Sequence, residues 1–373
     1  MINLKAINLH KIIMKLKDPF VTSSQTIQEK EILLIEVIDE NNLQGWGEVV
    51  AFSSPWYTEE TIQTAEHIIE DFLIPLLFNQ SFSHPSEVAN LFSIYQRNSM
   101  AKAGIEGAIW DLYAKQNSLP LSKVIGGVRK KIDVGVAIGI QPSIEKLIDL
   151  IKIYVDEGYK RVKIKIKPGY DIQVIDRIRS LFPNLALMVD ANSAYSMKDL
   201  PLLKELDPYQ LLMIEEPFKP NQFIELMHLQ KEIETPICLD ESIHSFEDVR
   251  LAHVLGSGKI INVKIGRVGG LTEAIKIHDY CLNNGISIWC GGMLETGIGR
   301  AHNIALASME NFTIPGDISA SSKYWDEDII TPEVSVQHGQ IQISSGYGIG
   351  YEVNRRRLDK YLLYTKFFKK TDI

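Results

Sequence analysis

The chain has few cysteines, no strongly basic segment and no long apolar run, and each of these features excludes a class of protein. Its only cysteines are Cys238, Cys281 and Cys290, which lack a paired metal-ligand spacing. No apolar run reaches ~18 residues, so we expect no membrane association. A formal net charge of −8, with no basic stretch interleaved with aromatic residues, argues against nucleic-acid binding. The N-terminus lacks the apolar core of a signal peptide, and together with reduced thiols this predicts a cytoplasmic protein.

The clearest positive signal is a charged residue that recurs at the end of short apolar runs. In the stretch Val162-Lys-Ile-Lys-Ile166, Lys163 and Lys165 share one face of a predicted strand, because successive side chains point to opposite faces. From Lys165 onward, such run ends follow at intervals of 25, 25, 25 and 24 residues. They are Asp190, Glu215, Asp240 and Lys264.

A repeat of this length predicts an α/β barrel. A parallel strand with its returning helix needs about 25 to 35 residues, and several such units in succession favour a barrel. The first strand is expected at residues 134–140, the seventh at 286–290 and a short eighth at 312–314. Because the C-terminal strand ends of a barrel share one mouth, the five charged residues should converge there. The alternative is that they are ordinary charges at strand ends, which the recurrence disfavours.

The N-terminal third has a different pattern. Alternating apolar residues predict strands at 2–13, 30–38 and 43–50, and Thr58 is expected to begin a helix that ends near Phe72. We therefore expect an α+β domain over residues 1–125 and the catalytic barrel over 126–320. Residues 321–373 cannot add a barrel strand and should return to the first domain, with a hairpin of 333–336 and 340–344.

Two loops of the first domain are candidate substrate contacts. Residues 18–26 are small and polar around Phe20, and either a lid over the site or a plain surface loop fits them equally well. Residues 51–57 form a second loop, rich in serine and aromatic residues, that contains Phe52.

Three carboxylates at the predicted mouth favour a bound metal ion. Asp190, Glu215 and Asp240 cannot all stay ionised at close range without a counter-cation. Mg²⁺ prefers oxygen ligands and keeps positions open for substrate, and Mn²⁺ is an alternative. Zn²⁺ is disfavoured, because no His or Cys stands at these strand ends. A cluster neutralised only by lysines stays open as the alternative.

Lys165 and Lys264 come from strands on either side of the three carboxylate strands, so they should face each other across the metal. A lysine that is partly buried beside a cation loses proton affinity and can act as a base near neutral pH. The predicted reaction is proton abstraction next to a substrate carboxylate, with a metal stabilising the enediolate. Three roles stay open for Lys163. It could lower the pKa of Lys165 by repulsion, it could hold the substrate carboxylate, or its side chain could serve only in packing.

Two residues and one glycine-containing segment are further candidates for supporting the site or contacting the substrate. Asn192 and Glu241 follow predicted ligands and are expected to hold them in place, and Asn192 is also a candidate substrate contact. In Gly291-Gly292-Met293 the backbone amides of Gly291, Gly292 and Met293 could approach the substrate closely, although a tight turn explains the glycines almost as well.

Taken together, these motifs resemble the enolase superfamily, and within it the muconate lactonizing enzyme subgroup. The resemblance covers nearly the whole chain and rests on five segments in order. They are Lys163-Ile-Lys165, Val189-Asp-Ala-Asn192, Ile214-Glu-Glu-Pro217, Leu239-Asp-Glu-Ser242 and Asn262-Val-Lys264. It implies a modified (β/α)7β barrel with an N-terminal α+β capping domain that the C-terminal tail completes. It also implies that Asp190, Glu215 and Asp240 bind Mg²⁺, with Lys165 as acid and base on one face and Lys264 on the other.

Finer segments resemble the family of o-succinylbenzoate synthases and N-acylamino acid racemases. They are Trp289-Cys-Gly-Gly-Met-Leu-Glu-Thr-Gly-Ile-Gly-Arg300 and Pro315-Gly-Asp-Ile-Ser319. The resemblance implies dehydration of 2-succinyl-6-hydroxy-2,4-cyclohexadiene-1-carboxylate in menaquinone biosynthesis, with racemisation of N-acylamino acids as the alternative or as a second activity. It implies a small carboxylate substrate and a homo-oligomer. Ala137 is a departure, because related racemases often have Ser at this position.

Overall fold

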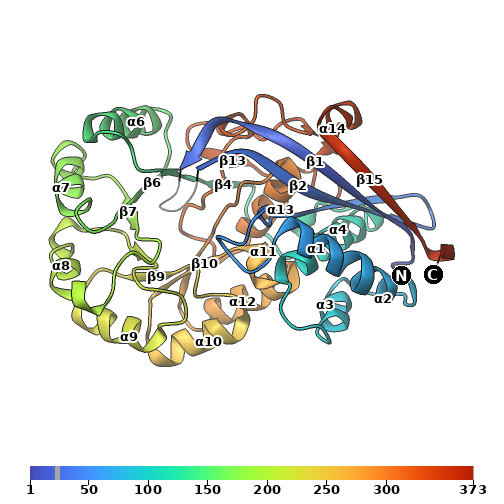
Figure 1. The fold of residues 1–373 in the computed structure, drawn as a ribbon, viewed down its shortest axis with the longest axis horizontal. Helices are drawn as coiled ribbons and strands as arrows, with labels where there is room; N and C mark the ends of the chain where they lie inside the picture. The colour runs from blue at the N-terminus through green and yellow to red at the C-terminus, as the bar shows by residue number, and fades with distance from the viewer. Residues whose placement is uncertain (22–25, 373) are drawn as a thin grey trace.

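The N-terminal cap is built on a four-stranded antiparallel sheet (Figure 1). The computed structural model of the chain describes residues 1–21 and 26–372. Strands β1 (Leu4–Val21), β2 (Thr26–Asp39) and β3 (Gln44–Val49) follow one another in the sheet, and β15 (Leu362–Lys369) lies on the outer side of β1. The register pairs Ala6 with Lys369, so the two chain ends lie together at one end of the cap.

Helices follow β3 in the chain, and some of them pack on one face of this sheet. They are α1 (Ile62–Ile68), a π-helix (Ile69–Leu73), α2 (Ile74–Phe78), α3 (Ser86–Phe92), α4 (Ser99–Gln116) and α5 (Leu121–Val124). The long helix α4 is buried along most of its length and lies directly on β3. Glycines make this approach possible, because a Cβ at Gly47 would lie 2.0 Å from the carbonyl oxygen of Gly104.

The second unit is a curled parallel sheet of seven strands with helices on its outer face. In chain order the strands are β5 (Gly135–Ile138), β6 (Arg161–Lys165), β7 (Leu187–Asp190), β8 (Ile214–Glu215), β9 (Ile237–Leu239), β10 (Ile260–Val263) and β11 (Ser287–Cys290). The helices are α6 (Ile144–Asp156), α7 (Ile172–Leu181), α8 (Leu200–Lys204), α9 (Phe223–Glu232), α10 (Phe246–Leu255), α11 (Ile265–Val268), α12 (Leu271–Asn283) and α13 (Gly297–Ala307). Neighbours in the chain are neighbours in the sheet, as the repeat predicts.

Residues 312–317 occupy the eighth position. No strand is assigned to them in the described chain, so the predicted strand at 312–314 reduces to single bridges. Phe312 bridges to Ile288 of β11, and Gly316 bridges to Val134 beside β5. The amide of Asp317 also donates to the carbonyl oxygen of Cys290, at 3.1 Å. This segment therefore connects the two edge strands and closes the barrel.

The C-terminal segment returns to the cap, as predicted. Before β15 it forms two small antiparallel pairs and one helix. The pairs are β4 (Lys131–Asp133) with β13 (Gln340–Gln342) and β12 (Ile330–Thr331) with β14 (Glu352–Val353), and the helix is α14 (Arg355–Tyr361). The predicted hairpin of 333–336 with 340–344 reduces to one antiparallel bridge, between Gln337 and Gln340 across the turn at His338-Gly339, because β13 pairs with β4 instead. The domain limits at 125 and 320 stay predictions.

Two expectations for the cap are corrected by the structure. The predicted loop at 18–26 is shorter, because β1 runs to Val21, β2 starts at Thr26 and these two residues pair. Residues 22–25, the centre of the proposed lid, lie outside the described residues. The first helix begins at Thr61, not Thr58, because the Thr61 hydroxyl accepts a hydrogen bond from the amide of Thr64.

Glu48 of β3 connects the cap to the barrel. Its buried carboxylate accepts hydrogen bonds from the amide and hydroxyl of Thr296 and from the amide of Gly299, at 2.6–3.0 Å, at the N-terminus of α13.

We expect Glu48→Ala to lower the free energy of unfolding in urea by about 3 kcal/mol, because buried donors lose their acceptor. The matched control is Glu40→Ala, an exposed residue next to the turn after β2. Equal stability of the two variants would contradict this role.

Candidate active site

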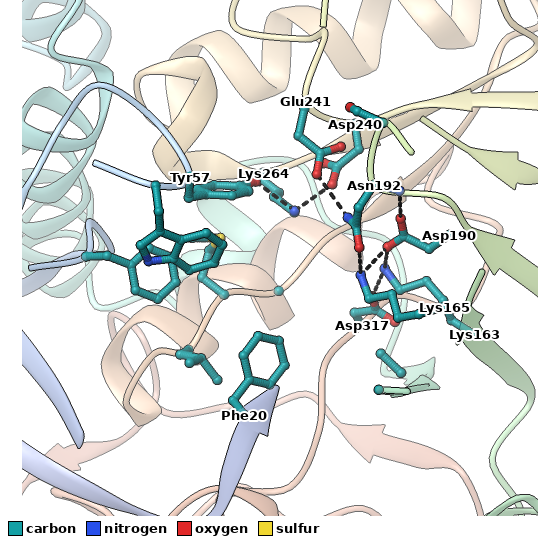
Figure 2. Close-up of a pocket in the computed structure, with 18 of the residues that line it drawn as sticks. Phe20, Tyr57, Lys163, Lys165, Asp190, Asn192, Asp240, Glu241, Lys264 and Asp317 are labelled. Carbon is teal, nitrogen blue, oxygen red and sulfur yellow. Dashed lines mark hydrogen bonds and ion pairs between the residues drawn. The ribbon is translucent and has the colours of Figure 1, made fainter. Parts of the chain in front are cut away.

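A cavity of about 300 Å³ lies between the C-terminal ends of the barrel strands and the aromatic loop of the cap (Figure 2). Its floor carries lysine and carboxylate side chains, and its roof is aromatic. The lining residues are Phe20, Phe52, Trp56, Tyr57, Ala137, Gly139, Lys163, Lys165, Asp190, Asn192, Ser193, Pro220, Asp240, Glu241, Lys264, Gly292, Met293, Leu294, Asp317 and Tyr324. This volume suits a small molecule.

The sheet register explains the spacing in the sequence. Lys165 on β6 pairs with Asp190 on β7, and Asp190 pairs with Glu215 on β8. Each interval of 25 residues thus spans one loop, one helix and the next strand. The residue at its end therefore lies at the same level of the sheet as the residue at its start. Asp240 follows the last residue of β9, and Lys264 follows the last residue of β10.

Lys165 lines one side of the cavity. Its Nζ donates to Asp190 Oδ2 and to Asn192 Oδ1, both at 2.6 Å. The Asn192 amide nitrogen donates in turn to Glu241 Oε1 at 3.1 Å, and the Asn192 backbone donates to Asp190 Oδ1 at 3.0 Å. Asn192 therefore connects the base candidate to two carboxylates, and the roles predicted for it stay predictions.

Lys264 lines the other side of the cavity, apart from Lys165 (Figure 2). Its Nζ donates to Asp240 Oδ2 at 2.8 Å and to the Tyr57 hydroxyl at 2.9 Å. Burial alone would lower the pKa of Lys264, but the charge of Asp240 outweighs burial and raises it. Without a bound cation, the anion Asp240 lies against the ammonium group. The lowered pKa predicted beside a bound cation stays a prediction.

Arg267 and Tyr57 complete this side, and the sequence reasoning missed both. Arg267 lies one helical turn after Lys264, and its Nη1 donates to Asp240 Oδ1 at 2.5 Å and to the Tyr57 hydroxyl at 2.9 Å. The Tyr57 hydroxyl thus accepts from two cations at once. Arg267 could have been found from its position three residues after Lys264, which places both side chains on one face of a helical turn. Nothing in the sequence distinguishes Tyr57 from the aromatic residues beside it.

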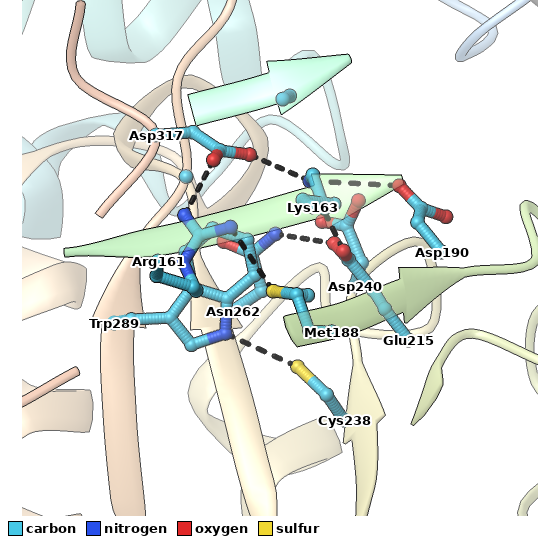
Figure 3. A network of polar contacts seen from close by, with 12 residues as sticks. Arg161, Lys163, Met188, Asp190, Glu215, Cys238, Asp240, Asn262, Trp289 and Asp317 are labelled. Atoms are coloured by element: carbon cyan, nitrogen blue, oxygen red, sulfur yellow. Dashed lines mark hydrogen bonds and ion pairs between the residues drawn. The ribbon is translucent and has the colours of Figure 1, made fainter. Parts of the chain in front are cut away.

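Lys163 is held by carboxylates on three sides (Figure 3). Its Nζ lies 2.6 Å from Asp317 Oδ2, 3.0 Å from Glu215 Oε2 and 3.5 Å from Asp190 Oδ2. Burial alone would lower the pKa of Lys163, but the three negative charges raise it well above the ordinary value. Lys163 lines the cavity and is 5% exposed, so most of its ammonium group is committed to these partners.

The carboxylates do not form the open cluster that the sequence predicts. In the described part of the chain, no group of three or more Asp, Glu, His or Cys side chains is arranged to hold a metal ion. Lys163 contacts Asp190 and Glu215, and Lys264 contacts Asp240. Cationic side chains therefore occupy the carboxylate oxygens that a metal ion would need.

The donor set nevertheless fits a divalent cation. Burial and then repulsion from Asp190 raise the pKa of Glu215 to about 8, and burial and then repulsion from Asp240 raise that of Glu241 to about 8. Glu241 Oε2 is buried and finds no hydrogen-bond partner among the described residues. Unpaired carboxylate oxygen and excess negative charge are what a hard cation satisfies, and an all-oxygen set suits Mg²⁺-like ions.

The remaining predicted contacts divide into two groups. Phe20, Phe52, Gly292 and Met293 line the cavity, as does Ala137. Gly291 does not line the cavity. It lies against the Lys264 side chain, and a Cβ at Gly291 would come within 2.8 Å of the lysine Cε. Its amide donates to Val263, so that amide is not free for a substrate.

Models of known protein families match both parts of the chain. Residues 6–126 match the family model of the mandelate racemase / muconate lactonizing enzyme N-terminal domain, and residues 146–357 match that of the enolase C-terminal domain-like family. An o-succinylbenzoate synthase of Geobacillus stearothermophilus is 53% identical, covering 99% of each chain. An N-succinylamino acid racemase of Thermus thermophilus is 39% identical, covering 98% of each chain. The crystal structure of an enolase superfamily member from Listeria innocua superimposes with a TM-score of 0.97 at 46% identity, covering 99% of this chain and 100% of that one.

The capped barrel and its strand-end lysines and carboxylates define an enolase superfamily protein. The chain belongs to the mandelate racemase / muconate lactonizing enzyme family. Enzymes of the superfamily use a lysine or histidine base together with divalent metal ions. Across the described residues, no helix is both long and apolar enough to cross a membrane.

Proposed function

We propose that this chain is an o-succinylbenzoate synthase that dehydrates 2-succinyl-6-hydroxy-2,4-cyclohexadiene-1-carboxylate to 2-succinylbenzoate. One observation carries the proposal: Lys165 and Lys264 line one small cavity from opposite sides of the strands that bear Asp190, Glu215 and Asp240. The full-length identity of 53% to a synthase, against 39% to a racemase, favours dehydration as the main reaction.

Lys165 performs both proton transfers. The substrate carries its acidic proton on ring carbon 1, beside the carboxylate, and its hydroxyl group on carbon 6. Lys165 Nζ takes the proton from carbon 1, and the electron pair of that bond moves into the carboxylate to give an enediolate. The enediolate then collapses to a double bond between carbons 1 and 6, and the Lys165 ammonium gives its proton to the departing hydroxyl, which leaves as water.

The developing negative charge needs positive charge nearby. The Lys264 ammonium, fixed between Asp240 and Tyr57, provides it from the far side of the cavity. Asp190, Glu215 and Asp240 would hold a divalent cation, which supplies further stabilisation of the enediolate charge when bound. We propose Mg²⁺ as that ion, with Mn²⁺ as a substitute.

The cap shields this chemistry from water. Phe52 packs against Trp56 with ring centroids 4.6 Å apart, and against Tyr57 at 6.0 Å. Phe20 lines the cavity from the end of β1. These rings provide an apolar surface for the substrate ring and lower the local dielectric, so the charges of the lysines act more strongly. We propose that these side chains, with Gly292 and Met293, contact the substrate.

Tyr57→Phe tests how Lys264 is held. We expect kcat/KM for dehydration to fall about tenfold, because two cations lose a shared acceptor. The matched control is Tyr347→Phe, which removes a hydroxyl from a residue that is 60% exposed. Steady-state kinetics of both variants check the prediction, and equal rates would mean that the Tyr57 hydroxyl does not support Lys264.

The proposed function is tested by incubating purified protein with Mg²⁺ and the cyclohexadiene substrate. We expect a product that has lost one water and has the proton NMR spectrum of 2-succinylbenzoate, formed in proportion to the enzyme. Unchanged substrate at micromolar enzyme would rule out the synthase reaction.

The same proposal includes a place in menaquinone biosynthesis, a cytoplasmic location and a homo-oligomeric assembly.

A second candidate function is racemisation of N-succinylamino acids. The observation that favours it is the position of the two lysines on opposite sides of the cavity, so each reaches one face of an α-carbon. In D₂O, we expect the protein to exchange the α-proton of both enantiomers. Lys165→Ala and Lys264→Ala should each lose exchange with one enantiomer and retain it with the other. Absence of exchange by the unaltered protein would exclude this function.

A further inference from the structure

Asp317 lies where the barrel closes and contacts two cations of β6 (Figure 3). Its Oδ1 is 2.5 Å from Arg161 Nη2, and its Oδ2 is 2.6 Å from Lys163 Nζ. Arg161 and Lys163 are two positions apart on the strand, so both project toward the barrel interior. Although burial alone would raise the pKa of Asp317, these two charges lower it, so the carboxylate stays ionised.

Arg161 fixes the direction of the Asp317 carboxylate. The Arg161 side chain is fully buried, its Nε donates to the carbonyl oxygen of Pro315 at 2.8 Å, and its guanidinium carbon lies 4.9 Å from the centre of the Trp289 ring. Because Pro315 and Asp317 belong to the same closing segment, Arg161 holds that segment at two points. One carboxylate oxygen of Asp317 is therefore left pointing at Lys163.

Lys163 shares its single charge among three carboxylates. Two of them, Glu215 at 3.0 Å and Asp190 at 3.5 Å, are the proposed ligands of the divalent cation. The Lys163 ammonium would be repelled from those oxygens by a cation bound there. Asp317 is then the carboxylate that remains to balance the charge of Lys163, because it lies on the side away from the proposed ligands.

We propose that Asp317 is a positioning residue that holds the Lys163 ammonium and thereby leaves Glu215 and Asp190 free to bind a divalent cation. The inference rests on the metal site of the proposed function, but it does not depend on which substrate is turned over. Without the Asp317 charge, Lys163 stays on Glu215 and Asp190 and competes with the cation for their oxygen atoms.

The test is calorimetric titration with Mg²⁺ of four proteins: the unaltered chain, Asp317→Asn, Lys163→Met and the double variant. We expect Asp317→Asn to weaken Mg²⁺ binding about tenfold, the effect typical of residues that orient metal ligands. In the Lys163→Met background, Asp317→Asn should change the Mg²⁺ affinity by less than about twofold, because the ammonium group that Asp317 holds is absent. Asp326→Asn removes a negative charge from an exposed residue nearby in the chain and is the matched control.

Two outcomes would overturn the inference alone. Asp317→Asn could bind Mg²⁺ as tightly as the unaltered chain, or it could weaken binding by the same factor in both backgrounds, in which case its charge acts directly on the metal. An unaltered chain that binds no Mg²⁺ would overturn the inference together with the proposed metal site. The dehydration assay separates these cases from failure of the proposed reaction.

A second measurement needs no variant and covers the case in which Asp317→Asn does not fold. Crystal structures of the unaltered protein with and without Mg²⁺ should show Lys163 Nζ moving away from Asp190 and Glu215 when the ion binds, while its contact with Asp317 is kept. A Lys163 that leaves Asp317 on metal binding would contradict the inference.

Discussion

Lys165→Ala is expected to lower kcat for dehydration by about 10²–10⁴-fold, the range for loss of a general acid–base group. Lys165 Nζ is the group that takes the proton and returns it to the hydroxyl, so alanine removes both transfers. We expect the variant to stay folded, because Asp190 keeps Lys163 as a counter-ion at 3.5 Å. Steady-state rates and a thermal unfolding curve check the two halves of this prediction.

Lys167→Ala is the matched control for Lys165→Ala. It removes an ammonium group two positions further along the same segment, where the side chain is exposed and does not line the cavity. The control should keep the rate of the unaltered protein. If Lys165→Ala retained full turnover, another group would be the base and the assignment would fail.

Removal of divalent metal is expected to lower the dehydration rate by about 10³-fold, since a bound cation supplies several kcal/mol of stabilisation to a developing anion. The physical reason is local charge. Asp190 and Asp240 lie at the cavity with Glu241, and a substrate carboxylate would be repelled by them without a cation. Activity after dialysis against EDTA, and after adding back Mg²⁺ or Mn²⁺, measures the effect.

EDTA saturated beforehand with Mg²⁺ is the control for the chelator itself and should leave the rate unchanged. A full rate in excess free EDTA would show that the lysines alone balance the carboxylates. That result would support the alternative that the sequence left open, a carboxylate cluster neutralised only by lysines.

The barrel and its charged strand ends could be predicted from the sequence because both follow from one period. Lys165, Asp190 and Glu215 are in register in the sheet, and the interval of 25 residues reflects that register. The return of the C-terminus to the cap was also predictable, because the barrel pattern stops before it. The turn at His338-Gly339 was predicted, but the strand at 333–336 was not formed, because a short alternating run does not specify its pairing partner.

Contacts between distant segments could not be predicted. Tyr57 reaches Lys264 across 207 residues, and Asp317 reaches Lys163 from a segment with no strand pattern of its own. Such contacts depend on how the cap sits on the barrel and on how the barrel closes, neither of which is encoded in local spacing. The pairing of Lys163 with proposed metal ligands was missed for the same reason, because the period places charges at one level without showing which of them touch.

The most direct test of the central claim is a comparison of two kcat/KM values in one preparation with saturating Mg²⁺. One is for dehydration of the cyclohexadiene carboxylate and the other is for racemisation of an N-succinylamino acid. We expect dehydration with kcat/KM above about 10⁴ M⁻¹s⁻¹ and slower racemisation. Negligible dehydration alongside efficient racemisation would contradict the synthase assignment and leave only the shared proton abstraction beside a carboxylate.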